Sequence, residues 1–239
     1  MRILVAAPPK TGNMWVKCLL GRTYGLRQLL PRETPRQATL QHFQKWVAEG
    51  NFPDGTIYHQ HYDYSDQLCD IAEGIPAHIV TLVRDPYDAF VSTYYTLQQH
   101  YEEDNKKKRR LVALMGKPLD SPEVIEFLRE GGYRNNLVKA RDWMTCGRAV
   151  VIRYEDLHRD PVSALKRATS MIAPASDEDV ARAVEQCSAD NMRQQSPGME
   201  KHVREAKPGD ARQKLTEAHY AAFREAYADL VTELGYEIR

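Results

Sequence analysis

Four short apolar runs divide the chain, at residues 3–7, 55–61, 78–83 and 149–153. Each run ends at charged, polar or proline residues, a pattern typical of buried strands in a sheet. Between the runs, apolar residues recur at helical spacing. This pattern predicts helices at residues 14–20, 40–50, 63–73, 87–99, 122–130, 135–144, 162–172, 177–187 and 216–234.

Strands separated by helices predict an α/β fold with a central, mainly parallel sheet flanked by helices. Ligands of such a sheet bind outside the carboxyl ends of its strands. Lys10, His59, His61, Arg84 and Tyr154 each lie at or soon after the end of a predicted strand. We therefore expect one crevice to bring these side chains together.

Two stretches lack the alternation of strand and helix. In the first, acidic residues 102–104 precede basic residues 106–110. A solvated helix face or a mobile loop is the preferred interpretation there, and a lid over a bound ligand is the alternative. The second stretch, residues 190–214, is polar with scattered Pro and Gly. It predicts a long loop, and since long loops without secondary structure usually serve a function, we expect it to fold over a ligand.

Length and charge narrow the class of protein. The 239 residues suit one α/β domain, and no internal repeat divides them, so residues 1–239 are expected to form a single domain. The 33 basic and 33 acidic side chains balance, which gives no overall attraction to nucleic acid or to a membrane surface. No apolar run approaches the roughly 20 residues of a membrane-spanning helix. Any anion site must therefore be local.

The spacing of the cysteines indicates in which cellular compartment the protein is expected. Cys18, Cys69, Cys146 and Cys187 are far apart in the sequence and lack C-x-x-C spacing. This pattern predicts neither a zinc site nor a disulfide framework. No secretory signal opens the chain, so we expect a soluble protein of the reducing cytoplasm.

The segment Pro8–Asn13 lies between the first predicted strand and the first predicted helix. Backbone N–H groups at a helix start have no intrahelical acceptor and lie at the positive end of the helix dipole, so the loop is expected to bind a phosphate or sulfate. Lys10 and Thr11 add a cation and a hydroxyl. The Walker A pattern is absent, which weakens a nucleoside-triphosphate kinase interpretation.

The loop Pro9–Trp15 resembles the Pro-Lys-Ser-Gly-Thr-Thr-Trp loop of cytosolic-type sulfotransferases, enzymes that use 3′-phosphoadenosine 5′-phosphosulfate. The segment from Val83 is similar to the family's 3′-phosphate segment, Arg-Asn-Pro-x-Asp-x-x-x-Ser, with Arg84 and Ser92 at the family's spacing. A strand-end guanidinium can bind a phosphate through two hydrogen bonds. The alternative for Arg84 is an ion pair with Asp88 that only caps the helix.

Two further segments extend the resemblance. Residues 153–157 are similar to the family's Tyr-Glu-Asp-Leu element, whose Tyr approaches the nucleotide, so Tyr154 is a binding candidate. Residues 204–212 partly match the family's Arg-Lys-Gly-x-x-Gly-Asp-Trp-Lys loop and retain Arg204. The matches follow the family's order from residue 3 to about residue 216. The resemblance thus implies a P-loop-like, three-layer fold over nearly the whole chain.

The sequence also departs from the family. The adenine-stacking Phe of the family's Ser-Phe-x-x-Met segment is replaced by Ala189 in Ser188–Met192. Trp15 is then the main candidate for stacking on adenine. The family's dimerisation motif would align at residues 212–221 and keeps only a basic residue and Thr216, so the oligomeric state is left open.

The resemblance implies a role for each motif. His61 stands where the family has the base that removes the acceptor's proton, and imidazole suits this task because its ordinary pKa is near neutrality. Lys10 is expected to stabilise charge on the leaving group, and no metal is required. The residues expected to bind the donor are Lys10, Thr11, Gly12, Asn13, Met14, Trp15, Arg84, Ser92, Tyr154 and Arg204.

The sequence is therefore identified as that of an enzyme that transfers a sulfuryl group to a hydroxyl, or as second choice an amine, of a small-molecule acceptor. The product nucleotide would be adenosine 3′,5′-bisphosphate. The acceptor is expected to lie against residues 62–68, 94–101 and 105–117, of which the first two segments carry tyrosines. Two alternatives stay open: a phosphotransferase on a P-loop-like cradle, and a nucleotide-binding protein without catalytic activity.

Overall fold

The computed structural model of the chain describes residues 1–35, 37–99, 114–195 and 208–239. Within these residues, a five-stranded sheet has the order β2-β3-β1-β4-β5, and all of its strand pairs are parallel. The α/β class and the mainly parallel sheet are thereby confirmed. The strands are β1 (Arg2–Ala6), β2 (Arg27–Gln28), β3 (Thr56–Gln60), β4 (Ala77–Val83) and β5 (Val150–Arg153).

The register of the central strands positions the predicted site. β1 lies between β3 and β4, and Val5 is opposite both His59 and Val80. Because the strands are parallel, their carboxyl ends meet at one edge of the sheet. The segments that follow β1, β3 and β4 carry Lys10, His61 and Arg84, so the sheet brings them to the same edge.

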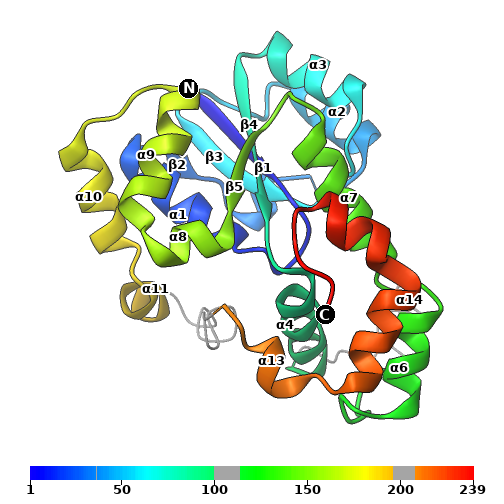
Figure 1. The fold of residues 1–239 in the computed structure, drawn as a ribbon. Helices are drawn as coiled ribbons and strands as arrows, with labels where there is room; N and C mark the ends of the chain where they lie inside the picture. The colour runs from blue at the N-terminus through cyan, green and yellow to red at the C-terminus, as the bar shows by residue number, and fades with distance from the viewer. Residues whose placement is uncertain (36, 100–113, 196–207) are drawn as a thin grey trace.

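Helices cover both faces of the sheet (Figure 1). Ile3 and Val5 of β1 pack under α1, α9 and α10, whereas the alternate residues Leu4 and Ala6 pack with α2, α3 and α7. This period of two is that of a strand buried on both faces. The helices are α1 (Asn13–Thr23), α2 (Leu40–Ala48), α3 (Asp66–Gly74), α4 (Pro86–Gln99), α6 (Pro122–Arg129), α7 (Arg134–Thr145), α8 (Tyr154–Arg159), α9 (Pro161–Ile172), α10 (Asp177–Gln186), α11 (Ala189–Gln195), α13 (Ala211–Lys214) and α14 (Glu217–Glu233), with a 3-10 turn at Pro31–Glu33.

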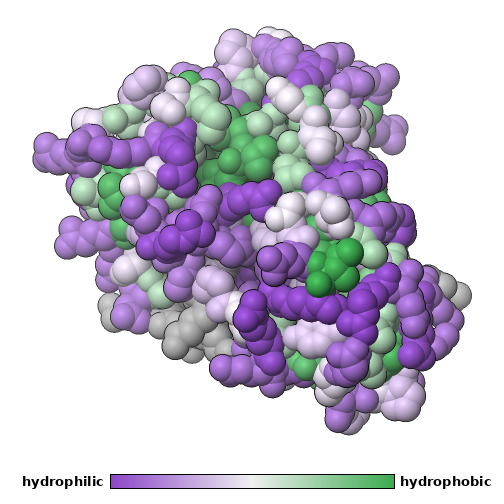
Figure 2. All heavy atoms as spheres, in the orientation of Figure 1, coloured by the Kyte–Doolittle hydropathy of each residue, from purple (hydrophilic) through white to green (hydrophobic). Residues whose placement is uncertain are grey.

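A third apolar cluster lies beside the sheet, where α4, α6, α7 and α14 pack together around Phe90, Phe223 and Tyr227. In Figure 2, hydrophilic residues cover most of the visible face, and hydrophobic residues gather near the edge strand β5. No helix in the described part of the chain is long and apolar enough to cross a membrane.

The predicted helices are confirmed with shifts of a few residues at their ends. The interpretation of residues 190–214 as one long loop is wrong, because α11 and α13 fall inside it. Both are short and polar, so their sequences carry no helical apolar period. Tyr154 also opens α8 rather than extending β5. The charged run at 102–110 and Arg204 lie outside the described residues.

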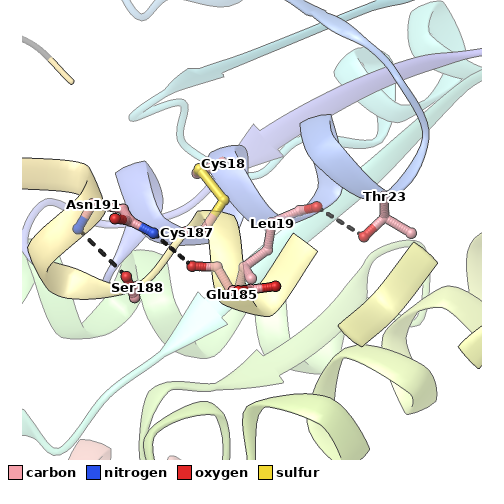
Figure 3. Close-up of a disulfide and its surroundings, with 7 residues drawn as sticks. All are labelled: Cys18, Leu19, Thr23, Glu185, Cys187, Ser188 and Asn191. Atoms are coloured by element: carbon pink, nitrogen blue, oxygen red, sulfur yellow. Dashed lines mark hydrogen bonds between the residues drawn. A yellow bond between two sulfur atoms is a disulfide. The ribbon is translucent and has the colours of Figure 1, made fainter. Parts of the chain in front are cut away.

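The expectation that no disulfide forms is wrong. Cys18 on α1 and Cys187 at the end of α10 form a disulfide with an S–S distance of 2.06 Å across a sequence separation of 169 residues (Figure 3). Sequence spacing failed here because packing of α1 against α10 brings the two Cα atoms to 5.9 Å. Cys69 and Cys146 are free thiols. The cysteines consequently give no support for a reducing compartment.

Removing this disulfide is expected to destabilise the fold strongly. In the chain-entropy model, a cross-link that closes a loop of well over a hundred residues contributes on the order of 5 kcal/mol, because it restricts the unfolded chain. Replacing both Cys18 and Cys187 by Ala should therefore lower the midpoint of urea unfolding, and a thiol reductant should lower it in the wild type. The double variant should not respond to reductant. Equal midpoints for wild type and double variant would contradict this prediction.

Candidate functional site

A cavity of about 880 Å³ lies at the carboxyl ends of the strands. It receives side chains from the loop after β1, from β3 and the residue after it, and from α1, α4 and α8. The structure thus confirms the expected crevice. The predicted site residues that line it are Lys10, Gly12, Asn13, Met14, Trp15, His59, His61, Arg84, Ser92 and Tyr154.

The loop before α1 has a constrained backbone. Gly12 precedes the helix with φ at 105°, and a Cβ there would lie 2.8 Å from the Tyr154 ring, so only glycine fits. The Thr11 hydroxyl and the Asn13 amide donate to the Pro8 carbonyl at 2.9 and 2.8 Å. The sequence predicted that the Thr11 hydroxyl binds an anion. In the structure this hydroxyl instead closes the loop, and Thr11 does not line the cavity.

Backbone N–H groups at this loop have no acceptor within the described part of the chain. The first intrahelical bonds run from Trp15 and Val16 to the Gly12 carbonyl at 3.0 and 3.1 Å. Among the described residues, no acceptor bonds the N–H groups of Thr11, Gly12, Asn13 or Met14. Four such donors at the positive end of a helix form an anion site.

Arg84 contributes a second set of donors. Its Nη1 donates to the Lys10 carbonyl at 3.0 Å, and its guanidinium lies 4.4 Å from the centroid of the Tyr154 ring. Its Nε is buried and has no hydrogen-bond partner among the described residues. A buried N–H without a partner is costly in a folded protein. Arg84 also lines the cavity, where a guanidinium can bind an anion.

The alternative of an Arg84–Asp88 ion pair is not what the structure shows. Asp88 instead accepts hydrogen bonds from the N–H groups of Gly209 and Ala211 at 2.6 and 2.8 Å. Asp88 thus fixes the start of α13 against α4. The Arg84 guanidinium contacts the Lys10 carbonyl of the loop, and Arg84 lines the cavity.

Asp85 fixes the strand end that carries Arg84. Its Oδ1 accepts from the N–H groups of Tyr87 and Asp88 at 2.9 and 3.1 Å, and its Oδ2 accepts from Arg239 at 2.6 Å. Burial raises the pKa of Asp85, and the bond from Asp88 and the charge of Arg239 oppose that rise. An aspartate occupies the position of the family's asparagine here, and Arg239 compensates its charge.

Trp15 and Tyr154 form the wall beside Arg84. Their ring centroids are 6.1 Å apart with an interplanar angle of 72°. Burial raises the pKa of Tyr154, and the charge of Arg84 opposes the rise, so the phenol stays protonated at neutral pH. Ala189 and Met192 line the cavity on α11, the helix in the stretch that the sequence predicted to cover a ligand.

His61 is held by contacts on both sides. Its Nδ1 lies 2.8 Å from the Ala7 carbonyl oxygen, and its backbone N–H donates to the Gln60 side chain at 3.0 Å. Lys139 donates to its backbone carbonyl. Because a carbonyl only accepts, the Nδ1 atom carries the proton and the lone pair of the neutral ring is on Nε2. In this tautomer Nε2 is the nitrogen that can accept a proton.

The sequence missed Lys17, which lines the same cavity from α1 and is 7% exposed. Burial lowers its pKa. A signal was present, since Lys17 is the one charged residue in the apolar stretch 14–20. Gln28, Leu29 and Leu30 also line the cavity, whereas no residue of the segment 62–68 expected to contact an acceptor does so. Tyr62 is in the core instead.

Within the described ranges, no group of three or more His, Cys, Asp or Glu side chains has the arrangement of a metal site. Among the described residues that line the cavity, Asp210 carries the one carboxylate, and it forms an ion pair with Lys214 at 2.9 Å.

A family model described as a sulfotransferase domain matches residues 1–235. No curated protein matches the sequence. The fold resembles that of mouse sulfotransferase SULT7A1 complexed with PAP, with a TM-score of 0.71 at 17% identity, covering 97% of this chain and 84% of that one.

Two other solved structures share the fold. Retinol dehydratase in complex with androsterone and inactive cofactor PAP has a TM-score of 0.55 at 15% identity, covering 100% of this chain and 82% of that one. A putative steroid sulphotransferase from Arabidopsis thaliana has a TM-score of 0.54 at 16% identity, covering 100% of this chain and 78% of that one.

Proposed function

Because this chain belongs to the sulfotransferase domain family, we propose that it transfers a sulfuryl group from 3′-phosphoadenosine 5′-phosphosulfate to a hydroxyl of a small-molecule acceptor. An amine acceptor is the second choice. The similar structures of SULT7A1 and retinol dehydratase contain PAP, and that of retinol dehydratase also contains androsterone. Donor and acceptor of these classes support the proposal for this chain.

One observation supports the choice of donor: two groups of hydrogen-bond donors, the loop before α1 and Arg84, belong to residues of this cavity. The N–H groups of residues 11–14, which bond no acceptor among the described residues, are the first group. The Arg84 guanidinium is the second, and Ser92 lines the same cavity. A nucleotide with phosphates at both 3′ and 5′ positions uses both groups, whereas the phosphates of ATP form one chain. Trp15 and Tyr154 supply aromatic surface for the base.

The residues then have the following roles. The backbone of residues 11–14 holds the 5′-phosphate, and Arg84 with Ser92 holds the 3′-phosphate; Arg204, outside the described residues, is proposed to assist them. The donor supplies the sulfuryl group. His61 removes the acceptor's proton through Nε2, the nitrogen left basic by the bond between Nδ1 and Ala7. Lys10 neutralises the charge that develops on the leaving oxygen.

A phosphotransferase interpretation has weaker support. Magnesium-dependent phosphoryl transfer requires carboxylates that hold the metal near the phosphates. Among the described cavity residues, the one carboxylate is that of Asp210, which is paired with Lys214. No specific observation favours a protein without catalytic activity, and the contact between His61 Nδ1 and the Ala7 carbonyl supports a role for Nε2 in proton transfer.

Nucleotide selectivity tests the proposed donor. Adenosine 3′,5′-bisphosphate should raise the melting temperature more than ATP or adenosine 5′-monophosphate at equal concentration. In Arg84→Ala, the affinity for the bisphosphate should fall roughly 10- to 100-fold, since a charged hydrogen bond to phosphate is worth about 1.5–3 kcal/mol. Isothermal titration calorimetry measures both affinities.

Adenosine 5′-monophosphate is the internal control for Arg84→Ala. It lacks the 3′-phosphate, so the variant should bind it nearly as the wild type does. An equal loss for both nucleotides would mean that Arg84 acts only through the Lys10 carbonyl that it holds. Stronger stabilisation by ATP than by the bisphosphate would favour the phosphotransferase and contradict the proposed donor.

A further inference from the structure

Lys17 is a largely buried lysine to which the proposed mechanism gives no role. It is 7% exposed, and in the part of the chain that the structure describes, no hydrogen bond or ion pair to its side chain is formed. A cation in a largely buried side chain is unfavourable where no partner compensates its charge. Because Lys17 lines the cavity, a ligand with a negative charge would compensate it there.

The position of Lys17 on α1 indicates on which side of the cavity its side chain lies. Gly21 lies one helical turn after Lys17 on the same face, and a Cβ at Gly21 would lie 3.4 Å from the Gln28 side chain and 3.5 Å from that of Ile57. This face of α1 therefore looks toward β2 and β3. Side chains of a helix lean toward its N-terminus, so Lys17 leans from this face toward the cavity end of the sheet.

His61 and His59 lie on the same side. His59 follows Ile57 by two positions along β3, so their side chains share a face of the strand, and the rings of His59 and His61 have centroids 5.8 Å apart. Arg84 and Tyr154 follow β4 and β5, on the other side of β1. Lys17 is thus on the side of the candidate base, away from the 3′-phosphate site.

The surroundings of Lys17 fit an organic acid. Leu29, Leu30 and Pro31 line the cavity near Gln28, at the carboxyl end of the short strand β2. They offer apolar surface to a carbon skeleton, while Lys17 offers one cation. Burial lowers the pKa of Lys17, and a bound anion would favour its charged form.

We propose that Lys17 binds a carboxylate of the acceptor, which makes the acceptor a small hydroxy acid whose hydroxyl faces His61. This inference rests on the proposed sulfuryl transfer and adds the chemical class of the acceptor. In this arrangement Lys17 selects the acceptor, and Lys10 serves the leaving group.

Matched pairs of acceptors test this role. Hydroxy acids such as 4-hydroxyphenylacetate and 4-hydroxybenzoate are compared with their primary amides, which have nearly the same shape and no charge. The wild type should favour each well-used acid over its amide roughly 10- to 100-fold in kcat/KM, as expected for a charged hydrogen bond. In Lys17→Met this preference should disappear, while the rate with the amide stays nearly unchanged.

Lys45→Met provides a matched control. Its side chain is 76% exposed on α2, where it pairs with Glu49, so this change removes the same charge far from the cavity and should leave the preference intact. Three results would overturn the inference: acids and amides used equally by the wild type, a preference that survives in Lys17→Met, or an equal loss with acid and amide. The last result would place Lys17 at the transferred group.

A binding measurement separates this inference from the proposed function. Phenylacetate and phenylacetamide, which have no hydroxyl to sulfate, are titrated calorimetrically into the protein with and without adenosine 3′,5′-bisphosphate. Tighter binding of phenylacetate that depends on Lys17 supports the acid site even where no turnover occurs. If neither this acid nor the hydroxy acids bind better than their amides, the acid site is wrong. Failure of the bisphosphate to bind contradicts the proposed function alone.

Discussion

Replacing His61 by Ala should lower kcat by roughly 10²- to 10⁴-fold, the range typical of a lost general base. The Nδ1 atom of His61 is bonded to the Ala7 carbonyl oxygen at 2.8 Å, so Nε2 is the atom that we propose takes the acceptor's proton. Alanine offers no proton acceptor in its place. Release of the bisphosphate from the labelled donor, followed at saturating acceptor, measures the loss.

The nucleotide site should survive this substitution. His61 follows β3, on the other side of β1 from Arg84 and Tyr154, so the thermal shift with adenosine 3′,5′-bisphosphate should match that of the wild type. His78→Ala is the control, since His78 lies near the start of β4, away from the cavity, and its loss should spare kcat. Turnover of His61→Ala within a few-fold of wild type would exclude His61 as the base.

Replacing Lys10 by Met should lower kcat by roughly 10²- to 10³-fold, as observed when one donor that stabilises developing charge is removed. Lys10 follows β1 and lines the cavity beside the N–H groups of residues 11–14. Its charge matters most when negative charge builds up on the leaving oxygen. Methionine keeps the length of the side chain and removes the charge, and single-turnover kinetics with preloaded donor isolate the chemical step.

Binding of the bisphosphate distinguishes catalysis from positioning in Lys10→Met. The residue adopts a left-handed backbone with φ at 67°, and both Lys and Met carry the same Cβ, so the loop strain is unchanged by the substitution. The affinity for adenosine 3′,5′-bisphosphate should then fall much less than kcat does. If the affinity and kcat fell by equal factors, Lys10 would hold the nucleotide rather than assist the leaving group.

Much of the fold followed from local patterns. The run from residue 78 to residue 83 became β4 because an unbroken apolar stretch suits a strand covered on both faces. Residues 190–214 were predicted to form a loop because, among the described side chains of α11, Met192 is the one that is buried. A single buried side chain creates no helical period. β2 has two residues and carries no pattern of its own.

The sequence predicted which residues form the candidate site better than it predicted their contacts. Lys10, His61 and Arg84 were expected together because parallel strands end at one edge. The partners of Thr11 and Asp88 were not expected, since Thr11 closes its own loop and Asp88 reaches the far segment at Gly209. Which polar group a side chain selects depends on the backbone atoms that folding brings near it.

The sequence by itself determined the order of the four longer strands and of the longer helices, and the residues shared with sulfotransferases, because these depend on neighbours along the chain. The tertiary structure alone decided the Cys18–Cys187 disulfide, the unpartnered Nε of Arg84 and the burial of Lys17. Each of these depends on segments far apart in the sequence that packing brings into contact. Spacing along a chain carries no information about such distances.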